Sequence, residues 1–308
     1  MSRETKKEGM NLDFIDVRRA YFHADAQREV YVQLPEEDYE EGMCGMLVKA
    51  MYGTRDAAQN WEVAYIEFME SAGFVKGVAS PCVFYNSQRN IRTVIHGDDF
   101  TMLGNEDDLD WFRSRIKERF EVKVRGRLGP CETDDKSIRI LNRVVEWTNS
   151  GISYEADQRH AEIIVKQLGL EKESRSLSTP GVKLEEKQDE SESWEKEVSG
   201  SEATLYRALV ARGIYLSQDR SDIGYAVKEL SRKMSKPDTG DIERLKHLAR
   251  YLLGRERAVI HYDYQASPTE WTVWVDSDWA GCREIRRSTN GGSMSVSGAF
   301  LKAWSSTQ

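Results

Sequence analysis

The stretch Ile91-Arg92-Thr93-Val94-Ile95-His96-Gly97-Asp98-Asp99-Phe100-Thr101-Met102-Leu103 predicts a β-hairpin. Two largely apolar runs, 91–96 and 100–103, flank the short segment Gly97-Asp98-Asp99, a pattern typical of two strands joined by a tight turn. Such a turn projects adjacent carboxylates from one end of a sheet. An isolated Gly-Asp-Asp is more often a solvated loop than an active site, so the surrounding sequence has to decide between these two interpretations.

A further strand is predicted at Leu12-Asp13-Phe14-Ile15-Asp16-Val17, and a carboxylate stands near its end. If this strand neighbours the hairpin, Asp16, Asp98 and Asp99 meet at the same edge of a sheet. Three carboxylates repel one another unless divalent cations neutralise them. Two Mg²⁺ ions at close spacing would do so, and they would also clamp the attacking and leaving oxygens of a phosphoryl transfer.

The remaining pattern predicts a mixture of helices and strands. In the first 130 residues, short strands are expected at 31–34 and 44–48, and a helix is expected from Ala57 to Ala72, ended by Gly73. A second helix is expected after Asn105, which is a good N-cap residue. The later elements are a hairpin around 149–151, a helix at 157–168, three amphipathic helices between 205 and 257, and strands at 271–276, 291–296 and 299–304.

Composition limits the class of protein. The 308 residues are enough for two or three compact units, and 39% of them are hydrophobic. No apolar run is long enough for a membrane span and no secretory signal is recognised, so an intracellular location, cytoplasmic or nuclear, is expected. The four cysteines are too widely spaced to suggest a zinc knuckle or a disulfide framework. The net charge of −8 argues against a simple nucleic-acid-binding protein, but it allows an enzyme with a local basic channel.

Several motifs together resemble one family. Asp16-Val17-Arg18-Arg19-Ala20-Tyr21-Phe22-His23 resembles the first polymerase motif of copia-type long-terminal-repeat retrotransposon reverse transcriptases. Residues 49–61 are similar to their second motif, and His96-Gly97-Asp98-Asp99 resembles their Y-V-D-D turn. Later family landmarks are matched by 120–123 (FEVK), 177–180 (LSTP), 220–227 (RSDIGYAV) and 276–281 (DSDWAG). The motifs follow the family order over nearly the whole chain.

The resemblance implies an α+β protein from a Pol polyprotein, in which a reverse transcriptase region continues into a truncated ribonuclease H domain. The expected fold is a palm, an antiparallel sheet with helices on one face, that lacks most of the fingers. The expected domains are the palm at 1–130, the palm end or thumb region at 131–180, an acidic linker or mobile loop at 181–203, a helical connection at 204–265 and a truncated ribonuclease H-like three-stranded sheet at 266–308.

The resemblance also implies residue roles. Asp16 and Asp98 are the expected principal metal ligands, with Asp99 in support and Val17 included in the metal site. Tyr21 is expected to be the steric gate that admits deoxynucleotides, although ordinary core packing is an alternative. Lys123 is a candidate proton donor to pyrophosphate, or else a solvated lysine at a helix end. Trp61 is interpreted as a core anchor rather than a template contact.

Three features depart from the family pattern. Asp56 stands where the family has Gln near the incoming nucleotide, and a carboxylate there opposes triphosphate binding unless it points away. Ala58, His96 and Gly97 also replace the usual residues. The fingers are expected to be missing. Asp276 matches the first ribonuclease H carboxylate, but the later acidic residues are expected to be absent, so it is interpreted as a relic without activity.

The leading hypothesis is an RNA-directed DNA polymerase fragment, impaired or inactive as an isolated chain. It would use two Mg²⁺ ions, or Mn²⁺ in their place, with deoxynucleoside triphosphates, a primed RNA or DNA template and other segments of the Pol polyprotein. The parent polyprotein is expected to serve DNA integration as well. One alternative is a non-catalytic remnant that binds nucleic acid or a protein partner, in which the basic residues of the 205–257 helices either follow a hybrid duplex or form a solvated face. The other is a decayed reading frame without function.

Overall fold

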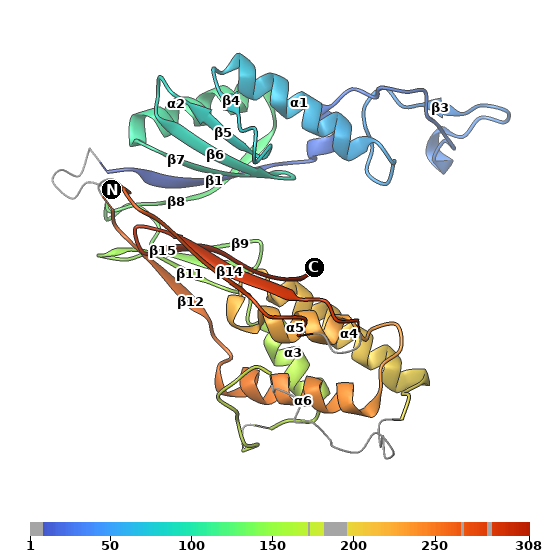
Figure 1. Cartoon of the computed structure of the whole chain (residues 1–308). Coiled ribbons are helices and arrows are strands. Elements are labelled where there is room, and N and C mark those ends of the chain that lie inside the picture. Colours follow the sequence, from blue (N-terminus) through green and yellow to red (C-terminus); the bar gives the residue numbers. More distant parts are fainter. Residues whose placement is uncertain (1–8, 172, 182–195, 266–267, 282–284) are drawn as a thin grey trace. The chain divides into compact units, whose positions relative to one another are not determined.

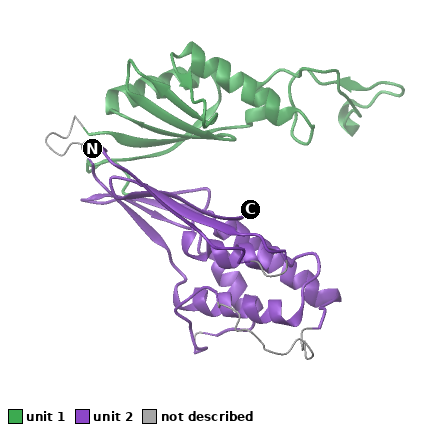
Figure 2. Cartoon of the chain, in the orientation of Figure 1, with its two compact units in different colours: residues 1–138 green, residues 139–308 purple. Residues whose placement is uncertain are grey.

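The computed structural model describes residues 9–171, 173–181, 196–265, 268–281 and 285–308. The chain divides into two compact units, residues 1–138 and 139–308, coloured green and purple in Figure 2. Most of the acidic segment predicted at 181–203 lies outside the described residues, as does Cys282.

Unit 1 is built on a six-stranded antiparallel sheet with the strand order β4-β5-β6-β7-β1-β8. Figure 1 shows its two long helices covering one face of this sheet. The strands are β1 (Asn11–Val17), β4 (Val75–Lys76), β5 (Val83–Asn86), β6 (Ile91–His96), β7 (Asp99–Gly104) and β8 (Val122–Leu128), and the helices are α1 (Ala57–Ser71) and α2 (Glu106–Arg119).

Alternation along the strands explains why the helices lie on one face. Along β6, Ile91, Thr93 and Ile95 are buried while the residues between them are exposed. Successive side chains of a strand point to opposite faces, so one face of β6 packs into the core. The core joins these strand residues to the apolar side of α1 and α2, with Trp61, Phe68 and Phe112 among its members.

The predicted elements of unit 1 are largely confirmed. The strand at 12–17, the helix from Ala57 and the helix after Asn105 all form, and Gly73 adopts a positive φ of 82° just after α1. One detail of the hairpin differs, because Asp99 is the first residue of β7 and not part of the turn. Strand β8 was not expected, and the interpretation of Lys123 as a helix-end lysine is wrong, since α2 ends at Arg119.

An arm of residues 25–56 connects the start of unit 1 to α1. It follows the short 3₁₀ helix η1 (Ala20–His23), contains the two-stranded ribbon of β2 (Tyr31–Val32) and β3 (Gly45–Met46) and the 3₁₀ helix η2 (Glu36–Asp38), and extends beyond the end of α1 in Figure 1. The predicted strands at 31–34 and 44–48 are therefore confirmed but shorter.

The described residues of unit 2 form four α-helices, one 3₁₀ helix and two further sheets. A four-stranded sheet has the order β12-β11-β10-β9, and a three-stranded antiparallel sheet has the order β13-β14-β15 (Figure 1). Strand β9 (Ser137–Ile140) crosses the boundary between the two units. The remaining elements, in chain order, are β10 (Arg143–Trp147), β11 (Gly151–Glu155), α3 (Arg159–Gln167), α4 (Gly200–Leu216), η3 (Ser221–Ile223), α5 (Gly224–Ser231), α6 (Thr239–Gly254), β12 (Val259–Asp263), β13 (Trp271–Ser277), β14 (Thr289–Val296) and β15 (Ala299–Thr307).

The α+β class predicted from the sequence is confirmed. Among the described residues, no helix has both the length and the apolar character needed to cross a bilayer.

A buried ion network fixes β1 in the sheet of unit 1. Asp13 is 1% exposed and accepts two hydrogen bonds from Arg127 of β8, at 2.6 and 3.0 Å, and two from Arg113 of α2, at 2.6 and 2.9 Å. Arg127 also donates to Asp110 of α2 at 2.7 Å. Such paired, forked bonds satisfy a buried carboxylate on both oxygens, so Asp13 joins three elements at one point.

Replacing Asp13 with Asn is expected to lower the free energy of unfolding by about 3 kcal/mol, because it leaves two arginines without their buried counter-charge. Chemical denaturation at neutral pH measures this loss. Glu118→Gln is the control, since it breaks an exposed pair with Arg115 within α2 and should cost less than about 0.5 kcal/mol. Equal losses in the two variants would contradict the assigned role of Asp13.

Candidate functional site

The turn between β6 and β7 holds the predicted acidic pair. His96 and Asp99 are cross-strand partners, so the turn itself is Gly97-Asp98. Gly97 adopts a φ of 63°, a left-handed conformation that glycine takes without strain. Two hydrogen bonds from outside the hairpin secure this turn. The Trp61 indole N–H donates to the Gly97 carbonyl at 2.8 Å, and the Val17 N–H donates to the Asp98 carbonyl at 2.9 Å.

Asp16 and Asp99 stand directly opposite each other on neighbouring strands, as cross-strand partners of β1 and β7. Side chains alternate along a strand, so both carboxylates point away from the helix-covered face where Ile15 and Phe100 are buried. Their side chains are 19% and 9% exposed. Burial raises the pKa of Asp99, and the neighbouring Asp98 and Asp16 raise it further, while Arg125 lowers it. The three carboxylates therefore share one electrostatic environment.

Arg125 of β8 bridges two of these carboxylates. Its guanidinium donates a hydrogen bond to Asp16, and the same nitrogen, Nη2, lies 3.3 Å from Oδ1 of Asp99. The hydrogen bond to Asp16 raises the pKa of Arg125, and Asp99 and Asp98 add to this. The sequence reasoning missed Arg125 because it did not anticipate β8. The alternation in 122–128 (VKVRGRL) was the signal that could have revealed the strand.

The donor chemistry at this point fits a divalent cation. Oδ1 of Asp99 is buried and has no hydrogen-bond partner in the described part of the chain, because Arg125 approaches it without suitable alignment. Val17 is fully buried, so only its main chain could contribute. In the arrangement seen, however, no group of three or more His, Cys, Asp or Glu side chains among the described residues is gathered closely enough to hold a metal ion.

Comparisons with known proteins bear on this site. Residues 5–131 match the family model described as reverse transcriptase (RNA-dependent DNA polymerase). The chain is 26% identical to the retrovirus-related Pol polyprotein from transposon TNT 1-94 of Nicotiana tabacum, over 96% of this chain and 22% of that protein. It is 24% identical to the Pol polyprotein from transposon RE1 of Arabidopsis thaliana, over 90% and 18% of the two chains. An uncharacterized mitochondrial protein of Arabidopsis thaliana is 33% identical over 64% of this chain and 75% of its own length.

The chain belongs to the copia-type retrotransposon Pol family. It contains the family's reverse transcriptase domain, within unit 1. The chain spans about a fifth of the length of the two Pol polyproteins named above.

Three other residues to which the copia-type resemblance gave roles, Tyr21, Lys123 and Asp56, lie in unit 1. Tyr21 follows β1 in η1 and stacks on Tyr52, with ring centroids 4.3 Å apart. Lys123 is exposed in β8, where it is the cross-strand partner of Asp16. Asp56 precedes α1 and forms an ion pair with Arg28 at 3.0 Å, which lowers the pKa of Asp56.

Two other predicted features have defined positions. Trp61 is 2% exposed within the core of unit 1, and its N–H reaches the Gly97-Asp98 turn. Asp276, from the ribonuclease H-like motif, is exposed in β13 of unit 2, opposite Gly291 of β14.

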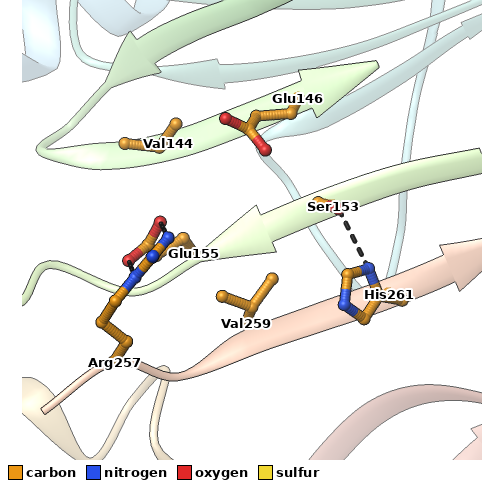
Figure 3. Close-up of a pocket in the computed structure, with 7 residues that line it drawn as sticks. All are labelled: Val144, Glu146, Ser153, Glu155, Arg257, Val259 and His261. Atoms are coloured by element: carbon orange, nitrogen blue, oxygen red, sulfur yellow. Dashed lines mark hydrogen bonds and ion pairs between the residues drawn. The ribbon is translucent and has the colours of Figure 1, made fainter. Parts of the chain in front are cut away.

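Unit 2 carries a separate polar hollow of about 350 Å³ on β10, β11 and β12, with further lining from Arg257 (Figure 3). Two of its charged groups are paired, since Glu155 accepts two hydrogen bonds from Arg257 at 2.8 and 2.9 Å. Ser153 and His261 are also joined, at 3.0 Å. Because these groups are already paired, we place the candidate site at the carboxylates of unit 1 and not at this hollow.

Trp61→Phe tests whether the indole N–H secures the Gly97-Asp98 turn. The substitution keeps an aromatic ring in the core but removes the hydrogen bond to the Gly97 carbonyl, so unfolding free energy should fall by about 1 kcal/mol. Amide hydrogen exchange at Val17 and Asp99 should accelerate. The control is Trp111→Phe, because Trp111 packs against the same core from α2. If both variants change exchange at the turn equally, Trp61 has no specific role there.

Proposed function

We propose that unit 1 is the palm of an RNA-directed DNA polymerase and that Asp16, Asp98 and Asp99 are its catalytic carboxylates. The observation that carries this proposal is the cross-strand pairing of Asp16 with Asp99, one residue after Asp98 in the connecting turn. This pairing brings residues 82 or more positions apart in sequence to one end of one sheet. Opposed carboxylates repel each other, and bound divalent cations would relieve that repulsion, which supports a cation-binding role for this end of the sheet.

The proposed reaction is nucleotidyl transfer. The 3′-hydroxyl of a primer attacks the α-phosphate of a deoxynucleoside triphosphate, and pyrophosphate leaves. Asp16 and Asp98 are the principal metal ligands, Asp99 supports them, and Val17 contributes through its main chain. Two bound Mg²⁺ ions, or Mn²⁺ in their place, would clamp the attacking and leaving oxygens and offset the charge that develops on the transferred phosphoryl group.

Two neighbouring residues are proposed to act on the nucleotide. Tyr21, fixed against Tyr52 just beyond the end of β1, would lie under the sugar and exclude a 2′-hydroxyl. Lys123 is exposed beside Asp16, which favours a role in donating a proton to pyrophosphate. Asp56 is the third residue that we assign to the substrate region. Its pairing with Arg28 reduces the repulsion that a free carboxylate would exert on a triphosphate.

The finer division of the chain is also a proposal. In it, residues 131–180 continue the palm toward a thumb, α4 to α6 form the connection, and β13 to β15 form a ribonuclease H-like sheet. Asp276, in β13, is proposed to be a relic of a ribonuclease H site without activity. Template, primer and other Pol segments are the proposed partners.

We propose that the isolated chain extends primers weakly. The supporting observation is the contact of Arg125 with Asp16 and Asp99, which neutralises the carboxylates that metal binding requires. The same contact favours the second candidate, a non-catalytic remnant that binds a hybrid duplex or a protein partner. Such a remnant would bind the duplex with a steep salt dependence and would not extend a primer.

Primer extension on an RNA template with Mg²⁺ separates these two candidates. Wild-type chain should extend the primer, and Asp98→Asn should lower the rate about 100-fold, because it removes a metal ligand that contributes on the order of 3 kcal/mol to the transition state. Asp107→Asn, the same chemical change at an exposed position of α2, is the matched control and should match the wild type. The polymerase proposal fails for this chain if the wild type extends no better than Asp98→Asn.

Sugar discrimination tests the role of Tyr21. Tyr21→Ala should raise incorporation of ribonucleotides relative to deoxynucleotides by about tenfold, since about 1.4 kcal/mol of steric exclusion is lost. Phe22→Ala, at the exposed neighbouring position, should leave this ratio unchanged. An unchanged ratio for Tyr21→Ala would instead assign Tyr21 to core packing.

A further inference from the structure

Two arginines of β8 contact carboxylates of β1, but they do so in different ways. Arg127 forms two parallel hydrogen bonds to Asp13, and its side chain is 10% exposed. Arg125 uses a single nitrogen, Nη2, for both Asp16 and Asp99, and its side chain is 36% exposed. A forked, buried pair is rigid, whereas a contact through one nitrogen at the surface can be exchanged at lower cost.

We propose that Arg125 is a built-in counter-ion, which holds Asp16 and Asp99 together in the metal-free chain and which a divalent cation must displace. This inference rests on the proposed function only in taking the same carboxylates as the metal ligands. It adds a regulatory element, because the affinity of this site for metal is then set by a residue of the chain itself.

The charges at this site support competition between the Arg125 guanidinium and a divalent cation. Asp16 and Asp99 face each other, and Asp98 is close enough to raise the pKa of Asp99. The guanidinium supplies one positive charge at the point where a divalent ion would supply two. Since arginine does not deprotonate in proteins, Arg125 cannot leave by losing its charge, and its side chain has to move. A cation therefore has to replace an existing ionic hydrogen bond before it binds.

The position of Arg125 permits that movement. Strand β8 is the edge of the six-stranded sheet, and its pairing with β1 shifts register between Phe14 and Ile15. Ile15 pairs with Val124 and Phe14 with Gly126, which leaves Arg125 as the extra residue of a β-bulge. Bulges redirect one side chain without breaking the sheet. The bulge explains how Arg125 reaches the carboxylates, and its side chain, which is 36% exposed, has space on the solvent side to turn away.

Binding of Mn²⁺ to the full-length chain, measured by electron paramagnetic resonance, tests the proposal without relying on catalysis. Arg125→Leu should bind Mn²⁺ at least about tenfold more tightly than the wild type, because the competing ionic hydrogen bond is gone. Arg92→Leu is the matched control. This substitution removes the same charge from an exposed residue of β6 in the same sheet. Arg92 is the cross-strand partner of Leu103, which in turn pairs with Leu12 of β1. The affinity for Mn²⁺ should change by less than about twofold.

The opposing outcomes are distinct. Unchanged or weaker Mn²⁺ binding by Arg125→Leu overturns the proposal, as does an equal gain in Arg92→Leu, which would indicate a general charge effect. Asp16→Asn combined with Arg125→Leu should abolish the gain, and its persistence would place the ion elsewhere. Primer extension is scored separately, so a chain that binds Mn²⁺ as expected but extends no primer contradicts only the proposed polymerase function.

Thermal unfolding provides a second readout and covers poor folding of the leucine variant. Without divalent ions, Arg125→Leu should melt at a lower temperature than the wild type, and Mn²⁺ should raise its melting temperature by more than that of the wild type. Arg125→Lys keeps the charge, so its Mn²⁺ affinity should stay within about threefold of the wild type. Lysine and leucine variants that both tighten binding equally would show that the charge at this position does not compete with metal.

Discussion

The mutual repulsion of Asp16 and Asp99 is the constraint on which the rest of unit 1 depends. They are direct cross-strand partners, in the part of the sheet where β1 lies between β7 and β8. Burial and the neighbouring carboxylates raise the pKa of Asp99, so the arrangement opposes the charged state that metal binding needs. The surrounding interactions compensate for this cost in two ways, by rigid anchoring of the backbone and by local charge neutralisation.

Anchoring and neutralisation are provided by different groups. Asp13, on the opposite face of β1 from Asp16, is tied to Arg127 and Arg113 by forked hydrogen bonds, while Trp61 and Val17 secure the carbonyls of the Gly97-Asp98 turn. These contacts involve main chain or fully satisfied ion pairs, and none of them engages the side chains of Asp16, Asp98 or Asp99. Among the described residues, Arg125 is the one cationic side chain that contacts Asp16 and Asp99 and so neutralises their charge. Its contact can be exchanged at lower cost than the forked hydrogen bonds of Asp13.

The sequence predicted those parts of the fold that depend on local patterns. Alternating apolar residues indicated β6 and the strand that ends near Asp16, and helical spacing indicated α1 and α2. Motif order identified the family. Strand β8 was missed although Lys123, Arg125 and Arg127 alternate along it with smaller apolar residues, and its bulge cannot be read from that alternation. The partner of the carboxylates was therefore not predictable before the pairing of β1 with β8 was known. The contact of Trp61 with Gly97 was hidden for a similar reason, since it joins residues 36 positions apart through a single indole N–H.

We propose that Asp16, Asp98 and Asp99 form a cation site from which Arg125 can be displaced. The most direct measurement is anomalous diffraction from crystals of the full chain grown with Mn²⁺. The account predicts a Mn²⁺ peak within about 2.5 Å of carboxylate oxygens of both Asp16 and Asp98, with the guanidinium of Arg125 turned away from Asp16. A map in which Mn²⁺ binds elsewhere, or in which no peak appears and Arg125 remains between Asp16 and Asp99, would contradict it.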